Sequence, residues 1–211
     1  AMLALFAFAI RELALAEAYT LFFIAPLLIT ALSTVVLREK VRPAHWVAIV
    51  LGMVGVLVAL RPNQEAFFTL GALAVLAAAT CYAVSAITGR MLTRTDSSAS
   101  LVFWTTTLLA LGAGALAWPQ WVGVAQAHWP LVAGLAVTGF AGQLAITEAF
   151  RHGQASVVAP FEYTALAWGM GLDWVLWQTV PGYSTLLGGA IIIGSGLYLV
   201  RQERTQAVVP P

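Results

Sequence analysis

One carboxylate lies inside a long apolar run with aromatic residues close by in the sequence. Glu162 comes six residues after Ser156, where the run begins, with Tyr163 beside it and Trp168 further along. An ionisable group near the middle of a membrane span costs about 2.5 to 3.5 kcal/mol to insert, so it is expected to face protein or a water-filled cavity. A carboxylate beside aromatic faces is suited to bind a cationic or zwitterionic ligand.

Two roles are open for Glu162. In the first, it binds a ligand and exchanges a proton, because burial in an apolar span disfavours the charged form of a carboxyl group. In the second, it is structural and pairs with a helix-end arginine such as Arg151, or bonds to neighbouring hydroxyls. Glu148 lies three residues before Arg151, a spacing that favours a local ion pair on a helix.

Other polar and aromatic residues complete the predicted ligand-binding set. Gln143 lies deep in its run, and the nearby Gly139 and Gly142 leave room for a ligand or for another helix. A proline inside a span bends the helix, which makes Pro26 and Pro160 either gating bends or static features of its shape. The remaining candidate binding residues are Tyr19, Phe23 and Tyr82.

The histidines give no support for a metal site. His45, His128 and His152 lie far apart in the sequence and lack the paired spacing of metal ligands. The sequence predicts neither a metal nor another cofactor. It also lacks a His-Glu-x-x-His helix and paired intramembrane aspartates, so we expect no enzyme activity.

The composition places these residues in a membrane. Hydrophobic residues make up 61% of the 211 residues and charged residues 9%, whereas a soluble domain carries about 25% charged residues. The formal net charge of +1 offers no electrostatic footprint for nucleic acid. Runs of about 20 apolar residues can cross a bilayer as helices. Eight apolar segments are predicted, the first too short to span: 1–10, 18–37, 44–60, 67–89, 98–118, 129–149, 156–178 and 183–200.

The fold class follows from the pattern within these runs. They lack the period-two alternation of a β-barrel and are rich in alanine and leucine, so we predict an all-α, polytopic membrane helix bundle. Lysine and arginine concentrate in alternate connections, which predicts that these loops and the C-terminus are cytoplasmic. The residues on this side are Arg38, Lys40, Arg42, Arg90, Arg94, Arg151, Arg201 and Arg204, and those on the other are Arg11 and Arg61.

Two stretches of the chain repeat one another. Ala9-Ile10-Arg11 opens the first and Ala149-Phe150-Arg151 opens the second, at an offset of about 140 residues, and each encloses a pair of apolar helices. Five helices separate equivalent elements, so the second copy is inverted in the membrane relative to the first. Inverted repeats are typical of transporters that work by alternating access around a midplane site. Chance resemblance between apolar helices is the alternative.

Several motifs resemble the EamA-type family of drug/metabolite transporters. The first copy has Glu17-Ala18-Tyr19-Thr20, Pro26 and Leu37-Arg38-Glu39. The second has Gly142-Gln143, Ala149-Phe150-Arg151, Ala159-Pro160-Phe161-Glu162-Tyr163-Thr164-Ala165-Leu166, Val180-Pro181 and Gly194-Ser195-Gly196-Leu197-Tyr198. The family often places an acidic residue before the proline that ends its ninth helix. This chain departs from that pattern with Gln178-Thr179-Val180-Pro181.

The resemblance implies a plan of ten helices in two inverted repeats, without the first two helices in this chain. Residues 1–62 would be the C-terminal part of the first repeat, 63–204 a complete second repeat and 205–211 a flexible cytoplasmic tail. It implies a transporter that moves small metabolites, such as amino acids, nucleotide-like compounds, vitamins or drugs, across the bacterial inner membrane without ATP hydrolysis. A non-transporting membrane sensor or assembly subunit is the alternative function.

Overall fold

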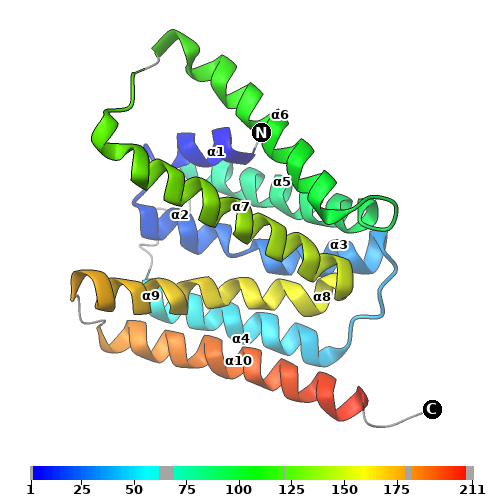
Figure 1. Ribbon diagram of the computed structural model, residues 1–211. Helices are drawn as coiled ribbons and strands as arrows, with labels where there is room; N and C mark the ends of the chain where they lie inside the picture. Colours follow the sequence, from blue (N-terminus) through cyan, green and yellow to red (C-terminus); the bar gives the residue numbers. More distant parts are fainter. Residues whose placement is uncertain (1, 62–68, 121, 179–181, 208–211) are drawn as a thin grey trace. The chain divides into compact units, whose positions relative to one another are not determined.

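The regular structure of the described chain is helical. The computed structural model describes residues 2–61, 69–120, 122–178 and 182–207 (Figure 1). Within these ranges there are α-helices and short 3₁₀ turns and no strand, which confirms the all-α prediction. The α-helices are α1 (Met2–Ala9), α2 (Leu15–Phe22), α3 (Ala25–Val36), α4 (Pro43–Leu60), α5 (Leu70–Leu92), α6 (Ser98–Ala117), α7 (Trp129–His152), α8 (Ala155–Val158), α9 (Thr164–Trp177) and α10 (Tyr183–Ala207). The 3₁₀ turns are η2 (Trp118–Gln120), η3 (Gln126–His128) and η4 (Ala159–Tyr163).

Six helical stretches of the described chain are long and apolar enough to cross a membrane. They are Glu17–Val36, Pro43–Leu60, Leu70–Leu92, Ser98–Ala117, Gln126–His152 and Tyr183–Gln202. Each of the eight predicted segments coincides with helical structure, and α1 has only 8 residues, as expected of a segment too short to span. The chain is therefore a polytopic helical membrane protein.

Local sequence explains several helix ends. Pro43 begins α4, where its missing N–H costs no hydrogen bond. Ser97 precedes α6, and its hydroxyl oxygen accepts a hydrogen bond from the backbone N–H of Ser100 over 3.2 Å. Arg38 follows α3 and Arg61 follows α4 with left-handed φ values of 54° and 45°, the conformation in which helices commonly stop.

Two segments that the sequence predicts as continuous helices are interrupted in the structure. The segment over 18–37 consists of α2 and α3, which are separated at Phe23 and Ile24, just before Pro26. The segment over 156–178 consists of α8, η4 and α9, and Pro160 lies inside the 3₁₀ turn. Proline has no N–H to donate to the preceding turn, so both breaks have a local cause in the sequence.

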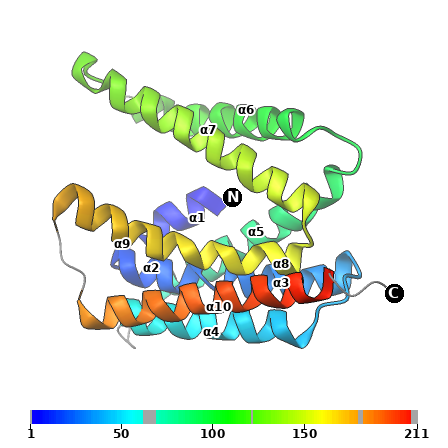
Figure 2. The ribbon, with the colours of Figure 1, turned by 60° about the horizontal axis from the view of Figure 1, so that its bottom comes forward.

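The chain forms two compact units, and most of the helices belong to the first. This unit contains the chain up to Ile87 and again from Gln154 onward. Within it, α4 and α10 pack along one another and run in opposite directions (Figures 1 and 2). Gly188 permits this close approach, because a Cβ atom there would lie 2.4 Å from the carbonyl oxygen of Gly55 and 2.6 Å from the nitrogen of Ala59.

The second unit runs from Thr88 to Gly153 and contains α6, α7 and the end of α5. Arg90 donates a hydrogen bond from Nη1 to the carbonyl oxygen of Arg151. Glu148 pairs with Arg151 over 3.9 Å, as their spacing predicts, and with His152 over 3.1 Å. Arg151 therefore has an acidic partner within its own unit.

Candidate functional site

Glu162 lies in the 3₁₀ turn η4, between α8 and α9. A 3₁₀ turn has three residues per turn, so neighbouring side chains point about 120° apart. Glu162 is half-buried, and Tyr163 is fully buried, with 0% of its surface exposed. The interrupted helix thus presents the carboxylate and the tyrosine ring to different neighbours.

A tyrosine on α5 holds the Glu162 carboxylate. Tyr82 donates a hydrogen bond from Oη to Glu162 Oε1 over 2.9 Å, so the hydroxyl partner considered for this residue is present. Arg151, the other partner considered, pairs with Glu148 in the second unit. Among the described residues, no basic side chain forms an ion pair with Glu162, and no donor reaches its second oxygen, Oε2.

Six aromatic rings form a continuous set that begins and ends beside Glu162. Neighbouring ring centroids lie 5.4 to 6.5 Å apart in the order Tyr82, Phe22, Phe6, Tyr19, Phe23 and Tyr163, which we call the aromatic cluster. Tyr82, at one end of the series, bonds to Glu162, and Tyr163, at the other end, is the next residue in the chain. The faces of such rings attract cations as well as one another.

Tyr163 fills a slot between α4 and α10. Its ring packs with Val56 and Ile192, and its centroid lies 5.8 Å from that of Phe23. Gly52 makes the slot, because a Cβ atom there would lie 2.4 Å from the Cδ2 atom of the ring. The hydroxyl of Tyr163 is buried and has no hydrogen-bond partner among the described residues. An unsatisfied buried hydroxyl costs about 1 to 3 kcal/mol, so a water or ligand oxygen bound to it would be stabilising.

Two carboxylates in the first unit have evident structural roles. Glu17 accepts a hydrogen bond from the backbone N–H of Ala14 over 3.2 Å, in a local cap at the start of α2. Glu39 reaches across to α8, where it accepts from the backbone N–H groups of Ala155 and Ser156 over 3.1 and 3.3 Å. The Ser156 hydroxyl donates a third bond to Glu39 over 3.3 Å. Both charges are balanced by donors at a helix start.

Glu162 accepts from Tyr82 alone among the described residues, whereas Glu39 accepts from two backbone N–H groups and a hydroxyl. One hydrogen bond to a charged group contributes about 1.5 to 3 kcal/mol, which offsets only part of the cost of about 2.5 to 3.5 kcal/mol over most of these two ranges. The Tyr82 bond alone therefore does not explain why the position carries a carboxyl group. Basic residues are also scarce, since His45 is the only one in the stretches 15–36, 43–60, 70–89 and 155–177.

The structure brings some of the predicted binding residues together and separates others. The aromatic cluster contains four of them, namely Tyr19, Phe23, Tyr82 and Tyr163. Trp168 lies on α9 with 73% of its surface exposed, and it forms no ring contact with another described residue. Gln143 lies on α7, in the second unit. Their part in ligand binding stays a prediction.

Two members of the aromatic cluster, Phe6 and Phe22, are missing from the predicted set. Phe22 lies three residues after Tyr19, a spacing that places both on one face of a helix. This spacing from Tyr19 is the signal in the sequence that could have found Phe22. Phe6 lies in the short first segment, and only tertiary packing brings its ring to Tyr19 and Phe22.

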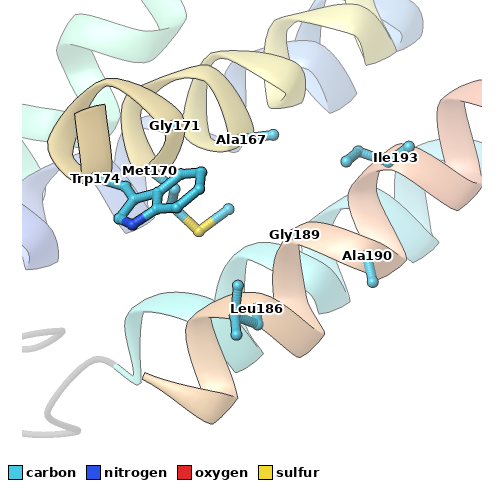
Figure 3. A pocket seen from close by; sticks show the side chains of 8 residues that line it. All are labelled: Ala167, Met170, Gly171, Trp174, Leu186, Gly189, Ala190 and Ile193. Atoms are coloured by element: carbon cyan, nitrogen blue, oxygen red, sulfur yellow. The ribbon is translucent and has the colours of Figure 1, made fainter. Parts of the chain in front are cut away.

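A surface groove of 530 Å³ lies between α9 and α10 and does not include Glu162 (Figure 3). Its lining has no charged side chain, and the indole nitrogen of Trp174 is its one side-chain nitrogen or oxygen. The lining residues are Ala167, Met170, Gly171, Trp174, Leu186, Gly189, Ala190 and Ile193. Such a surface suits an apolar chain and offers little to a polar metabolite.

The six apolar helical stretches define a multi-pass helical membrane protein, and its interrupted helices with a half-buried carboxylate are typical of transporters. The sequence profile of the EamA-like transporter family matches residues 1–61 and 69–201. The chain belongs to this family. The resemblance in the sequence motifs is thereby confirmed.

Curated relatives carry the names of exporters and uptake transporters. The chain is 27% identical to the pseudopaline exporter CntI of Pseudomonas aeruginosa, over 93% of this chain and 70% of the exporter. It is 32% identical to a riboflavin transporter of Vibrio cholerae, over 85% of this chain and 60% of the relative. It is 26% identical to an S-adenosylmethionine uptake transporter of Rickettsia conorii, over 86% of this chain and 62% of the relative. All three act on small molecules, by their names.

A solved crystal structure has the same fold. It superposes with a TM-score of 0.79 at 23% sequence identity and covers 96% of this chain and 72% of its own. At this identity the likeness concerns the fold and not the substrate.

Proposed function

We propose that the protein is a secondary transporter that moves a small metabolite across the bacterial inner membrane by alternating access. The observation that carries this proposal is the Glu162 carboxylate, held by Tyr82 in an interrupted helix beside the aromatic cluster. Charged groups inside spans typically mark substrate or ion pathways, and interrupted helices typically form transporter sites. A non-transporting membrane sensor or assembly subunit is the second candidate.

Alternating access is supported by the arrangement of the first unit. The α2–α3 pair and the α8–α9 pair run in opposite directions, as do α4 and α10 (Figures 1 and 2). We propose that these elements belong to two inverted repeats, residues 1–62 and 63–204, whose boundary at 62–68 lies outside the described residues. The tail proposed for 205–211 begins within α10, which extends to Ala207, and 208–211 also lie outside the description.

The substrate is proposed to be amino-acid-like, nucleotide-like or drug-like, in keeping with relatives named for pseudopaline, riboflavin and S-adenosylmethionine. The C-terminus is proposed to be cytoplasmic, because the alternate loops rich in arginine and lysine lie on that side. The direction of transport is left open, since the relatives include both an exporter and uptake transporters.

We further propose that Glu162 exchanges a proton during the cycle. The carboxyl group has no basic partner among the described residues, so a proton or a positively charged ligand must balance its charge. The other titratable side chains described close to η4 are Tyr82 and Tyr163. The helices α4 and α10 that pack against η4 add His45, Tyr183, Tyr198 and Arg201.

The test is flux into liposomes that contain the purified protein, with and without a pH gradient. The probes are radiolabelled S-adenosylmethionine, riboflavin and a mixture of amino acids. We expect at least one probe to accumulate above the level in protein-free liposomes, at a rate that the pH gradient changes. Binding of a probe without flux would favour the sensor, and neither binding nor flux by folded protein would overturn the transporter assignment.

A further inference from the structure

We propose that the transported molecule carries a positive charge, as an alkylammonium or sulfonium group, and that Glu162 Oε2 binds this charge. This inference rests on the proposed function and names the substrate class of its site. The family leaves open whether the metabolite is cationic, zwitterionic or neutral, and this inference selects a cation. Three parts of the site support it: the free oxygen of Glu162, the balance of charge and the rings.

The first part is the geometry of the carboxylate. Tyr82 occupies Oε1 over 2.9 Å and is the hydrogen-bond partner of Glu162 among the described residues. Oε2 is therefore available to a ligand while Tyr82 fixes the orientation of the carboxylate. Glu39 shows what a purely structural carboxylate looks like in this unit, because donors of Ala155 and Ser156 reach both of its oxygens.

The second part is the balance of charge around the site. His45, in the first turn of α4, is the only basic residue in the stretches 15–36, 43–60, 70–89 and 155–177. Gly52, which contacts the ring next to Glu162, lies seven residues further along α4, or about 10 Å of helical rise. An anionic substrate would find no fixed positive charge in these stretches near Glu162, whereas a cation would find an unpaired carboxylate.

The third part is the ring set beside the carboxylate. Phe22 and Tyr82 lie 5.6 Å apart by their centroids, and Tyr82 is bonded to Glu162. Ring faces within about 6 Å of a cation attract it through the charge distribution of the π system. Carboxylate and rings together favour an organic cation over a small, strongly hydrated metal ion. The apolar groove between α9 and α10 offers no such counter-charge.

The experiment compares two probes that differ in charge and match in size, phenethylammonium and 2-phenylethanol. Binding to the purified protein is measured by calorimetry, with S-adenosylmethionine as a second cation. We expect phenethylammonium to bind at least tenfold more tightly than 2-phenylethanol. Glu162→Gln, which keeps the acceptor for Tyr82, should remove at least tenfold of the affinity for either cation. Its thermal unfolding should match that of the unchanged protein.

Glu148→Gln is the matched control, because it removes another carboxylate of the membrane helices that lies in the second unit. It should leave the affinity for phenethylammonium unchanged. Equal binding of the neutral and charged probes, or equal loss in both variants, would overturn the inference. Flux of a neutral substrate such as riboflavin that survives Glu162→Gln would overturn the substrate class and leave the transporter standing. Cation binding at Glu162 without flux would overturn the transporter assignment and leave the cation site standing.

Discussion

The two interrupted helices of the first unit share a scaffold and differ in chemistry. Each breaks next to a proline and ends at a left-handed residue, Arg38 with φ of 54° after α3 and Gln178 with φ of 53° after α9. The left-handed residues lie about 140 positions apart and the two prolines about 134 apart, so the two interrupted helices follow similar courses along the chain. Each interrupted helix is followed by one of the two helices that pack together, α4 and α10.

The difference between the two lies in where the carboxylates are. Around the two prolines, Ala25-Pro26-Leu27-Leu28 aligns with Ala159-Pro160-Phe161-Glu162, so the first helix has the apolar Leu28 where the second has Glu162. The first interrupted helix contributes rings to the site and a cap for α8, and the second contributes the uncompensated charge. The two interrupted helices thus share their backbone breaks, and the carboxylate without a basic partner among the described residues lies in the second.

The largest effects on activity are expected at Glu162 and Phe22, one residue from each interrupted helix. Glu162→Gln should lower substrate flux by about 10- to 100-fold, the equivalent of a charged hydrogen bond of about 1.5 to 3 kcal/mol. Phe22→Leu should lower flux by less than about tenfold, since an aromatic pair contributes about 0.5 to 1.5 kcal/mol. Flux assays on both variants check this. Equal losses would contradict an unequal division of chemistry between the two interrupted helices.

The next largest effect is expected on stability, at the contact between α4 and α10. Gly188→Ala places a Cβ atom 2.4 Å from the carbonyl oxygen of Gly55, so the α4–α10 contact must widen. We expect a loss of about 1 to 3 kcal/mol in stability, the usual cost of overpacking, measured by thermal unfolding in detergent. Gly194→Ala on the same helix is the control, because no heavy atom lies within 4 Å of its Cβ position. That variant should be as stable as the unchanged protein or more so.

Tyr82 contacts both interrupted helices, through Phe22 and through Glu162, and Tyr82→Phe separates these two contacts. The variant keeps the ring that contacts Phe22 and loses the hydroxyl that donates to Glu162. We expect the affinity for phenethylammonium to fall by about tenfold, because a hydrogen bond to a charged group contributes about 1.5 kcal/mol or more. Tyr82→Leu, which removes both contacts, should lower this affinity further. If the two variants bind alike, the hydroxyl does not orient the carboxylate.

The smallest effect is expected at Glu39, which follows the first interrupted helix. Glu39→Ala removes the acceptor at the start of α8, a cap that typically contributes about 1 kcal/mol. Hydrogen exchange at the amides of Ala155 and Ser156 should accelerate by about fivefold. Glu17→Ala is the counterpart, since its cap is local to α2, and it should leave these two amides unchanged. Slow exchange in Glu39→Ala would show that the cap does not hold α8.

Composition and run length were sufficient to predict the fold, because apolar segments of membrane length have few alternatives to helices. The segment boundaries agree with the helices to within about three residues, except that α10 extends to Ala207 beyond the predicted end at 200. The two breaks were predicted only as bends, since Pro26 and Pro160 reveal a missing N–H but not whether the helix continues beyond it. Whether they act as gates stays a prediction.

The candidate site could be predicted in part. Glu162 stood out because a charge in an apolar run is costly wherever the run folds, and Tyr163 is adjacent to it in sequence. Its bond to Tyr82 could not be predicted, because the two residues lie 80 positions apart and on different helices. Phe6 was missed for the same reason. Trp168 was included on sequence proximity, and the structure exposes it at the surface of the chain.

Locating a bound cation tests most directly whether Glu162 binds the positive charge of the substrate. Crystals grown with para-bromophenethylammonium would show the bromine by its anomalous scattering and the ammonium group by its density. We predict the ammonium nitrogen within about 4 Å of Glu162 Oε2, the distance of an ion pair, with the bromophenyl ring against Phe22 and Tyr82. A cation bound in the groove between α9 and α10, with the carboxylate of Glu162 still unpaired, would contradict the account.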